Sequence, residues 1–118
     1  MKPKNMFKSF HYAWKGTVYV FRHEQNFRLQ LAAGFFIFSL GLFLGLSRAE
    51  TIVLLLLVFL VLILELLNSA LEKFVDILKP RLHSQVEIVK DIMAAMVLCA
   101  SIGAVVIGAI LFWPYLFR

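Results

Sequence analysis

Three long apolar segments dominate the pattern of hydrophobic and polar positions along the chain. They cover residues 29–46, 51–78 and 91–113, although polar side chains join the second one after Leu64. A membrane-spanning helix needs roughly 20 mostly apolar residues, so the first and third segments are long enough to cross a bilayer. The second is long enough only if it continues past Glu65. We therefore predict three spanning helices, the second with its polar end near one membrane face.

The polar end of the second segment carries its polar groups on one face. Four side chains share a sector of about 80° when each residue advances about 100° around a helix: Glu65, Asn68, Glu72 and Asp76. Ser69 falls on the same face. Acids within spanning helices usually face protein or a water-filled cavity and mark sites. We interpret this face as a functional site or, alternatively, as a buried ion-pair cluster that holds the helices together.

Positive charge is needed to relieve repulsion among these carboxylates. Lys90, just before the third segment, is predicted to lie at about the same depth. The other possibility is a divalent metal, because carboxylates from several helices suit Mg²⁺, which keeps some waters and binds substrate phosphates. Glu24, just before the first segment, could supply another ligand. Asp91 adds a further acid to the same interface.

Basic residues are distributed unevenly around the three segments. All but Arg48 and Arg118 of the 12 Lys and Arg residues fall before the first segment or in the region 73–90. By the positive-inside rule that side is cytoplasmic, so we predict a cytoplasmic N-terminus and an outer C-terminus. The connections are predicted at 46–50 and 79–87, where Pro80 marks a helix end.

Residues 6–22 predict an amphipathic helix that lies on the membrane surface. Apolar and aromatic side chains share one face: Phe7, Phe10, Trp14, Val18 and Phe21. Basic side chains recur at heptad spacing on another face: Lys8, Lys15 and Arg22. This combination is typical of helices in the interface plane. A surface anchor with no other role explains the pattern equally well.

The composition favours an all-α membrane protein with a single domain over residues 1–118. Hydrophobic residues make up 62% of the chain and the mean hydropathy is +0.88, whereas soluble domains are about half apolar. The net charge of +5 is scattered and matches no nucleic-acid motif, so we expect anionic lipid rather than nucleic acid as its partner. The histidines match no zinc pattern, and His83 is the one expected nearest a ligand.

Four short motifs resemble one known family. They are "AWKG" (13–16), "EQNFR" (24–28), "ELLNSALEKFVD" (65–76) and "KD" (90–91). Together they resemble the bacterial integral-membrane diacylglycerol kinase family, which includes undecaprenol kinases. The resemblance extends from about Phe7 to Trp113. Its longest motif, Glu-x-x-Asn-Ser-Ala-x-Glu-x-x-x-Asp, is too specific to be expected by chance in an apolar helix.

The resemblance implies a fold, a location and an activity. The fold is a surface helix plus three membrane helices. It assembles as a homotrimer in which neighbouring subunits share the active sites. The location is the bacterial cytoplasmic (inner) membrane. The activity is transfer of the γ-phosphoryl group of ATP, with Mg²⁺ as cofactor, to a lipid hydroxyl. The acceptor is diacylglycerol, giving phosphatidic acid, or alternatively undecaprenol. The segment "EQNFRLQ", with Gln30, looks somewhat more like the undecaprenol-type sequences.

The resemblance also implies residue roles. Glu65 matches the general base acting on the lipid hydroxyl, and Glu24 and Glu72 match the metal ligands. The ATP-binding positions match Tyr12, Glu24, Glu72, His83, Lys90 and Asp91. Asn68 and Asp76 support the site, and the lipid substrate contacts Trp14, Lys15 and Glu65. The segment "KPRLH" is more basic than the family pattern, which puts contacts by Arg81 and Leu82 in doubt.

Two other classes of function remain open. Acids within the membrane also form ion pathways, so the chain could be a small cation transporter. Against this, residues 52–64 offer no polar side chain through the midplane. The chain could also be a structural membrane subunit with a charge-paired interface.

Overall fold

The computed structural model describes residues 3–117, which form four helices and no strand. Their bounds are Pro3–His23 for α1, Gln25–Leu44 for α2, Arg48–Leu78 for α3 and His83–Leu116 for α4. The last three are long and apolar enough to cross a membrane. The predicted all-helical class with three candidate spans is thereby confirmed. Lys2 and Arg118, two of the 12 basic residues counted for the orientation, lie outside the described residues.

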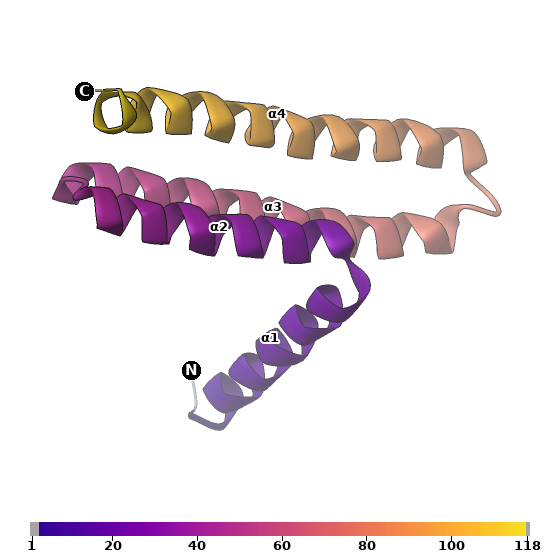
Figure 1. Ribbon diagram of the computed structural model, residues 1–118. Helices are drawn as coiled ribbons and strands as arrows, with labels where there is room; N and C mark the ends of the chain where they lie inside the picture. The colour runs from indigo at the N-terminus through magenta and orange to yellow at the C-terminus, as the bar shows by residue number, and fades with distance from the viewer. Residues whose placement is uncertain (1–2, 118) are drawn as a thin grey trace.

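The three long helices lie side by side, and α1 diverges from them (Figure 1). α3 packs against both α2 and α4. α1 meets the bundle only near its C-terminal end, where Val20 is buried. The start of α2, the end of α3 and the start of α4 therefore lie at one end of the bundle. The α2–α3 connection and the C-terminus lie at the other end.

The connection between α2 and α3 is shorter than the predicted 46–50 segment. Gly45 ends α2 with φ 77°, a left-handed conformation that glycine adopts without strain. Ser47 then starts α3 through a capping box, in which its hydroxyl accepts from the Glu50 N–H and its own N–H donates to Glu50 Oε1. Residues 48–50 are helical because these two bonds satisfy N–H groups that would otherwise lack a partner.

The helix α4 also begins earlier than the predicted span. Only 79–82 separate α3 from α4, so the polar residues 83–90 form the first turns of a helix whose apolar part follows. Apolar length measures only the part of a helix that faces lipid, and it misses polar turns that continue beyond the membrane. Lys90 and Asp91 consequently project from a regular helix rather than from a loop.

Close packing joins α2 to α3. A Cβ at Gly34 would lie 2.8 Å from Val58 Cγ1, and one at Gly41 would lie 3.1 Å from Leu54 Cδ2. Both glycines are buried. Small residues allow membrane helices to approach closely. This contact fixes α2 against the helix that carries the polar face.

α3 is one unbroken helix, as the lack of a breaker after Leu64 predicted. Its 31 residues give it a length of about 46 Å, at about 1.5 Å per residue. The hydrocarbon core of a bilayer is only about 30 Å thick. Glu65 lies about 26 Å along the helix from Arg48. A lipid core that began at Arg48 would therefore end about one helical turn beyond Glu65.

Candidate active site

Glu65 is a buried carboxylate on α3. Only 5% of its surface is exposed, and Ser69, one turn further along, is 4% exposed. In the described part of the chain these are the two buried polar residues. Because both lie on the predicted polar face, that face turns towards protein, where it meets the start of α2.

Glu24 reaches this face from the break between α1 and α2. It is the N-cap residue of α2, and its extended backbone separates the two helices. Its Oε1 accepts a hydrogen bond from Ser69 Oγ at 3.3 Å. Ser69 lies one turn after Glu65 and one turn before Glu72, so this bond brings Glu24 to the stretch of α3 that carries both acids. Three carboxylates thus converge at one end of the bundle, as the sequence predicted for this interface.

Arg28 fixes the break that carries Glu24. Its Nη1 donates to the carbonyls of Phe21 at 2.7 Å and Arg22 at 3.1 Å, in the last turn of α1. The Glu24 N–H donates to Val20 O at 2.8 Å. These bonds tie the end of α1 to the first turn of α2. They hold the backbone of Glu24 in place while its side chain points to α3.

Two further polar contacts extend the face along α3. Asn68 Nδ2 donates to Glu72 Oε1 at 3.4 Å, which orients the Glu72 carboxylate. Lys90 on α4 forms an ion pair with Asp76, with 2.9 Å between Nζ and Oδ1. Lys90 therefore lies at the depth of the polar face, as predicted. With side chains 32% and 52% exposed, this pair is open to solvent.

The remaining predicted site residues are exposed and lie on the surrounding helices. Tyr12, Trp14 and Lys15 lie on α1, where Tyr12 is 65% and Trp14 69% exposed. His83 is the first residue of α4, and Asp91 follows Lys90; both are exposed. Their assigned contacts with ATP or lipid stay predictions.

The metal-binding role of Glu24 and Glu72 also stays a prediction. Within residues 3–117, no group of three or more His, Cys, Asp and Glu side chains is arranged to hold a metal. Mg²⁺, however, is commonly bound by one or two protein carboxylates together with substrate phosphates and waters. The donor chemistry of Glu24 and Glu72 fits that kind of site.

Sequence reasoning missed three contacts at this end of the bundle. It placed Ser69 on the polar face but gave it no role, and it gave Arg28 none. It also missed Lys73, whose Nζ lies 5.6 Å from the ring centroid of Tyr19 and so links α3 to α1. The polar Ser69 inside an apolar helix was a usable signal. That signal marks Ser69 but not its partner, because all three contacts depend on the angle between α1 and the bundle.

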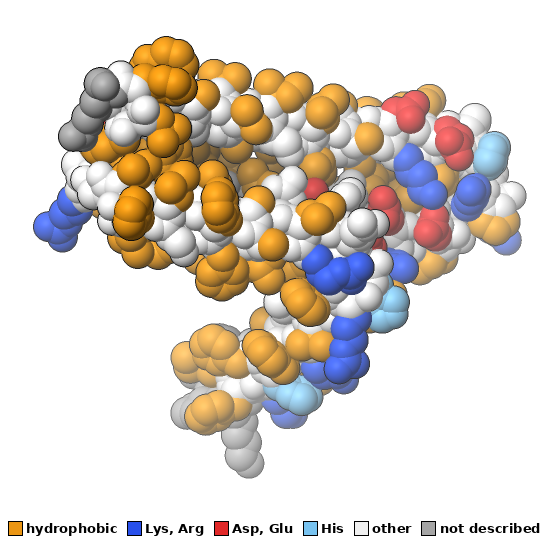
Figure 2. Space-filling view, in the orientation of Figure 1, with side chains coloured by type: hydrophobic (Ala, Val, Ile, Leu, Met, Phe, Trp, Pro, Cys, Tyr) orange, Lys and Arg blue, Asp and Glu red, His pale blue; other side chains and the backbone are white. Residues whose placement is uncertain are grey.

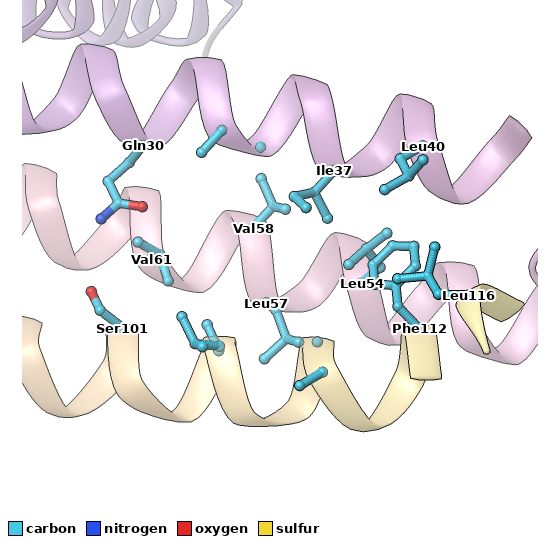
Figure 3. A pocket seen from close by; sticks show the side chains of 16 residues that line it. Gln30, Ile37, Leu40, Leu54, Leu57, Val58, Val61, Ser101, Phe112 and Leu116 are labelled. Carbon is cyan, nitrogen blue, oxygen red and sulfur yellow. The ribbon is translucent and has the colours of Figure 1, made fainter. Parts of the chain in front are cut away.

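Charged side chains gather at this end of the molecule. Figure 2 shows Asp and Glu side chains beside Lys, Arg and His where α3 and α4 are joined, while hydrophobic side chains cover most of the rest of the bundle. An apolar cavity of about 480 Å³ lies between α2, α3 and α4 (Figure 3). Val61 lines it one helical turn before Glu65, and Gln30 and Ser101 are polar residues in its lining. The charged end and the apolar cavity therefore adjoin at Glu65.

Comparison with known proteins decides the family. The model for the family described as prokaryotic diacylglycerol kinase matches residues 11–112. The chain belongs to this family. The match includes the break at Glu24, the whole polar face and the adjacent residues Lys90 and Asp91. The resemblance seen in the motifs is thereby confirmed.

Curated relatives in this family are named as lipid kinases. The chain is 41% identical over 111 residues to a diacylglycerol kinase from Synechocystis sp., covering 93% of this chain and 63% of that protein. It is 34% identical to the undecaprenol kinase of Bacillus subtilis, over 93% of this chain and 89% of that one. It is also 34% identical to the diacylglycerol kinase of Escherichia coli, over 88% and 85% of the two chains. With three helices able to span a membrane, this family member is a multi-pass bacterial membrane protein.

Proposed function

We propose that this family member transfers the γ-phosphoryl group of Mg-ATP to a lipid hydroxyl at the cytoplasmic face of the membrane. The observation that carries the proposal is the buried Glu65 carboxylate, on the same stretch of α3 as Glu72 and as Ser69, which binds Glu24. Phosphoryl transfer depends mainly on positioning and on neutralising charge. An arrangement of acids around a protected carboxylate supports that chemistry.

Glu65 is the proposed general base. Its carboxylate accepts the proton of the lipid hydroxyl as the hydroxyl oxygen attacks the γ-phosphorus. The bond between the γ-phosphorus and the β,γ-bridging oxygen breaks, and ADP leaves with that oxygen. The surrounding helices exclude water from the buried side chain, which favours the lipid hydroxyl over water as the acceptor. Val61 connects Glu65 to the apolar cavity, so a lipid can approach the base from the membrane side.

Glu24 and Glu72 are the proposed ligands for Mg²⁺. A bound Mg²⁺ would neutralise charge on the ATP phosphates. The hydrogen bonds from Ser69 to Glu24 and from Asn68 to Glu72 keep the two carboxylates oriented. Holding these acids in place before ATP arrives reduces the cost of assembling the site.

Lys90 is proposed to bind the phosphates of ATP. Its ammonium group is held by Asp76 but remains partly exposed, so it can still contact a ligand from the open side. The proposal gives Tyr12, His83 and Asp91 further contacts with the nucleotide. It gives Trp14 and Lys15 contacts with the lipid. Because these side chains face outward in one chain, the proposed homotrimer would complete the site with neighbouring subunits.

The acceptor is proposed to be diacylglycerol or undecaprenol. Relatives with each name cover most of this chain, so the names do not choose between them. Both acceptors present a hydroxyl at the interface and an apolar chain in the membrane. The proposed cytoplasmic orientation, with α1 on the membrane surface, places the charged end where ATP is available.

The test uses purified protein in mixed micelles with radiolabelled ATP and Mg²⁺. Diacylglycerol and undecaprenol are offered separately, and the phosphorylated lipid is measured. We expect Mg²⁺-dependent product with at least one acceptor. Folded protein that phosphorylates neither would exclude the proposal. Cation flux into liposomes without ATP would instead support the transporter alternative.

A further inference from the structure

Ser69 differs from three other helical hydroxyls in this chain. Ser9, Thr17 and Thr51 each donate to the backbone carbonyl four residues earlier, at 2.8–2.9 Å. That local bond is the usual choice for a hydroxyl inside a helix. Ser69 instead donates to the carboxylate of Glu24, 45 residues away in the sequence. Its hydroxyl therefore serves a contact between helices.

The position of Ser69 connects the three acids. It lies one turn after Glu65 and one turn before Glu72 on the same face of α3. With 4% of its surface exposed, it has little access to water that could replace its partner. A hydrogen bond to an ionised acceptor is stronger than one between neutral groups. The bond therefore sets where the Glu24 carboxylate stands relative to Glu65 and Glu72.

We propose that Ser69 is a positioning residue that orients Glu24 for binding the metal–nucleotide complex. This inference rests on the proposed function, because it assigns Glu24 to the metal. Arg28 fixes the backbone of Glu24 from the side of α1, and Ser69 fixes its carboxylate from the side of α3. Removing the hydroxyl leaves the helix break intact but lets the carboxylate rotate.

Binding of Mn²⁺ in place of Mg²⁺ tests this role without relying on turnover. Electron paramagnetic resonance measures the Kd of Mn²⁺ in the presence of a non-hydrolysable ATP analogue. Changing a group that orients a metal ligand typically lowers metal affinity by about 10–100-fold, and we expect Ser69→Ala to fall in that range. Ser69→Thr keeps the hydroxyl and should restore most of the affinity. Ser39→Ala, an exposed serine on α2, is the matched control and should not change the Kd.

A double-mutant cycle separates positioning from a general loss of structure. If Ser69 acts through Glu24, Ser69→Ala should add little to the loss already caused by Glu24→Gln. Fully additive losses, or an unchanged Kd in Ser69→Ala, would overturn the positioning role. A wild-type protein that binds no Mn²⁺ overturns both this role and the metal site. If the effects of Ser69→Ala and Glu24→Gln on Mn²⁺ binding are coupled but no lipid is phosphorylated, the role of Ser69 is supported. Only the proposed kinase activity is then excluded.

Discussion

Glu50 and Glu65 are acids on the same helix with opposite surroundings. Glu50, at the start of α3, accepts from the Ser47 N–H at 2.9 Å and from the hydroxyl of Tyr115 on α4. Glu65 is buried on the stretch of α3 that also carries Glu72 and that Glu24 reaches through its bond with Ser69. Hydrogen-bond donors satisfy the carboxylate of Glu50, whereas the nearest acidic neighbours of Glu65 destabilise its negative charge. The role of Glu50 is to stabilise the start of α3. Burying Glu65 near other acids costs folding free energy, and a site that binds cations and phosphate would account for that cost.

The largest expected effect comes from making the same substitution at both acids. Glu65→Gln removes the proposed base and should lower lipid phosphorylation by about 10²–10⁴-fold. Glu50→Gln should preserve activity, because an amide oxygen can still accept from Ser47 and Tyr115. Initial rates are measured on protein whose oligomeric state and circular dichroism match the wild type. Equal losses in the two variants would remove the distinction between these acids.

Glu72→Gln is the next test, because it changes an acid beside Glu65 without touching the base. Loss of a direct metal ligand should reduce the apparent affinity for Mg²⁺ by more than about 100-fold, exceeding the effect of an orienting group. Activity is measured across Mg²⁺ concentrations, and partial recovery at high Mg²⁺ is expected. A uniform loss at every Mg²⁺ concentration, with no change in the apparent affinity, would argue against a metal-ligand role.

The end of α3 that begins at Ser47 should respond in stability rather than in catalysis. Ser47→Ala removes the helix cap and should lower the free energy of unfolding by about 1 kcal/mol. The KM values for ATP and for lipid should stay unchanged, because the cap lies at the opposite end of α3. Thermal unfolding in detergent and steady-state kinetics measure the two effects. A change in KM with unaltered unfolding would contradict this separation.

The smallest expected effect on stability comes from the Lys90–Asp76 ion pair. Both side chains are partly exposed, and pairs of this kind contribute little to folding. Asp76→Asn should therefore leave the unfolding temperature nearly unchanged. It should raise the KM for ATP several-fold, because Lys90 loses the partner that holds it. If the unfolding temperature falls sharply while the KM stays constant, the pair is structural, as in the alternative interpretation of the polar face.

The sequence was sufficient for the polar face because a regular helix determines which side chains share a side. To place Glu65, Asn68 and Glu72 on one face, the prediction needed only a constant rotation per residue. The unbroken α3 satisfies that condition. The depth of Lys90 followed from its place before an apolar segment, and its ion pair with Asp76 agrees. Local periodicity and apolar length were enough for these features.

Contacts between distant segments were harder to predict. The bond between Glu24 and Ser69 depends on the angle at the α1–α2 break, which Arg28 sets through backbone carbonyls. No pattern of side-chain types encodes that angle. The start of α4 at His83 was missed for a different reason, since polar helical turns outside the lipid have no apolar signature. The sequence therefore predicted the faces of helices better than their ends and junctions.

The unbroken length of α3 couples the site to the membrane mechanically. Glu65 and the apolar span belong to one rigid rod, with no hinge between them. When a bilayer is thinner than the span, the helix can match it by tilting. Because Glu65 lies near one end of the apolar stretch, tilting about the middle of the span changes its depth more than that of residues at the midplane. Membrane thickness therefore influences how far the carboxylate lies from the headgroups, where the proposed acceptor would meet it.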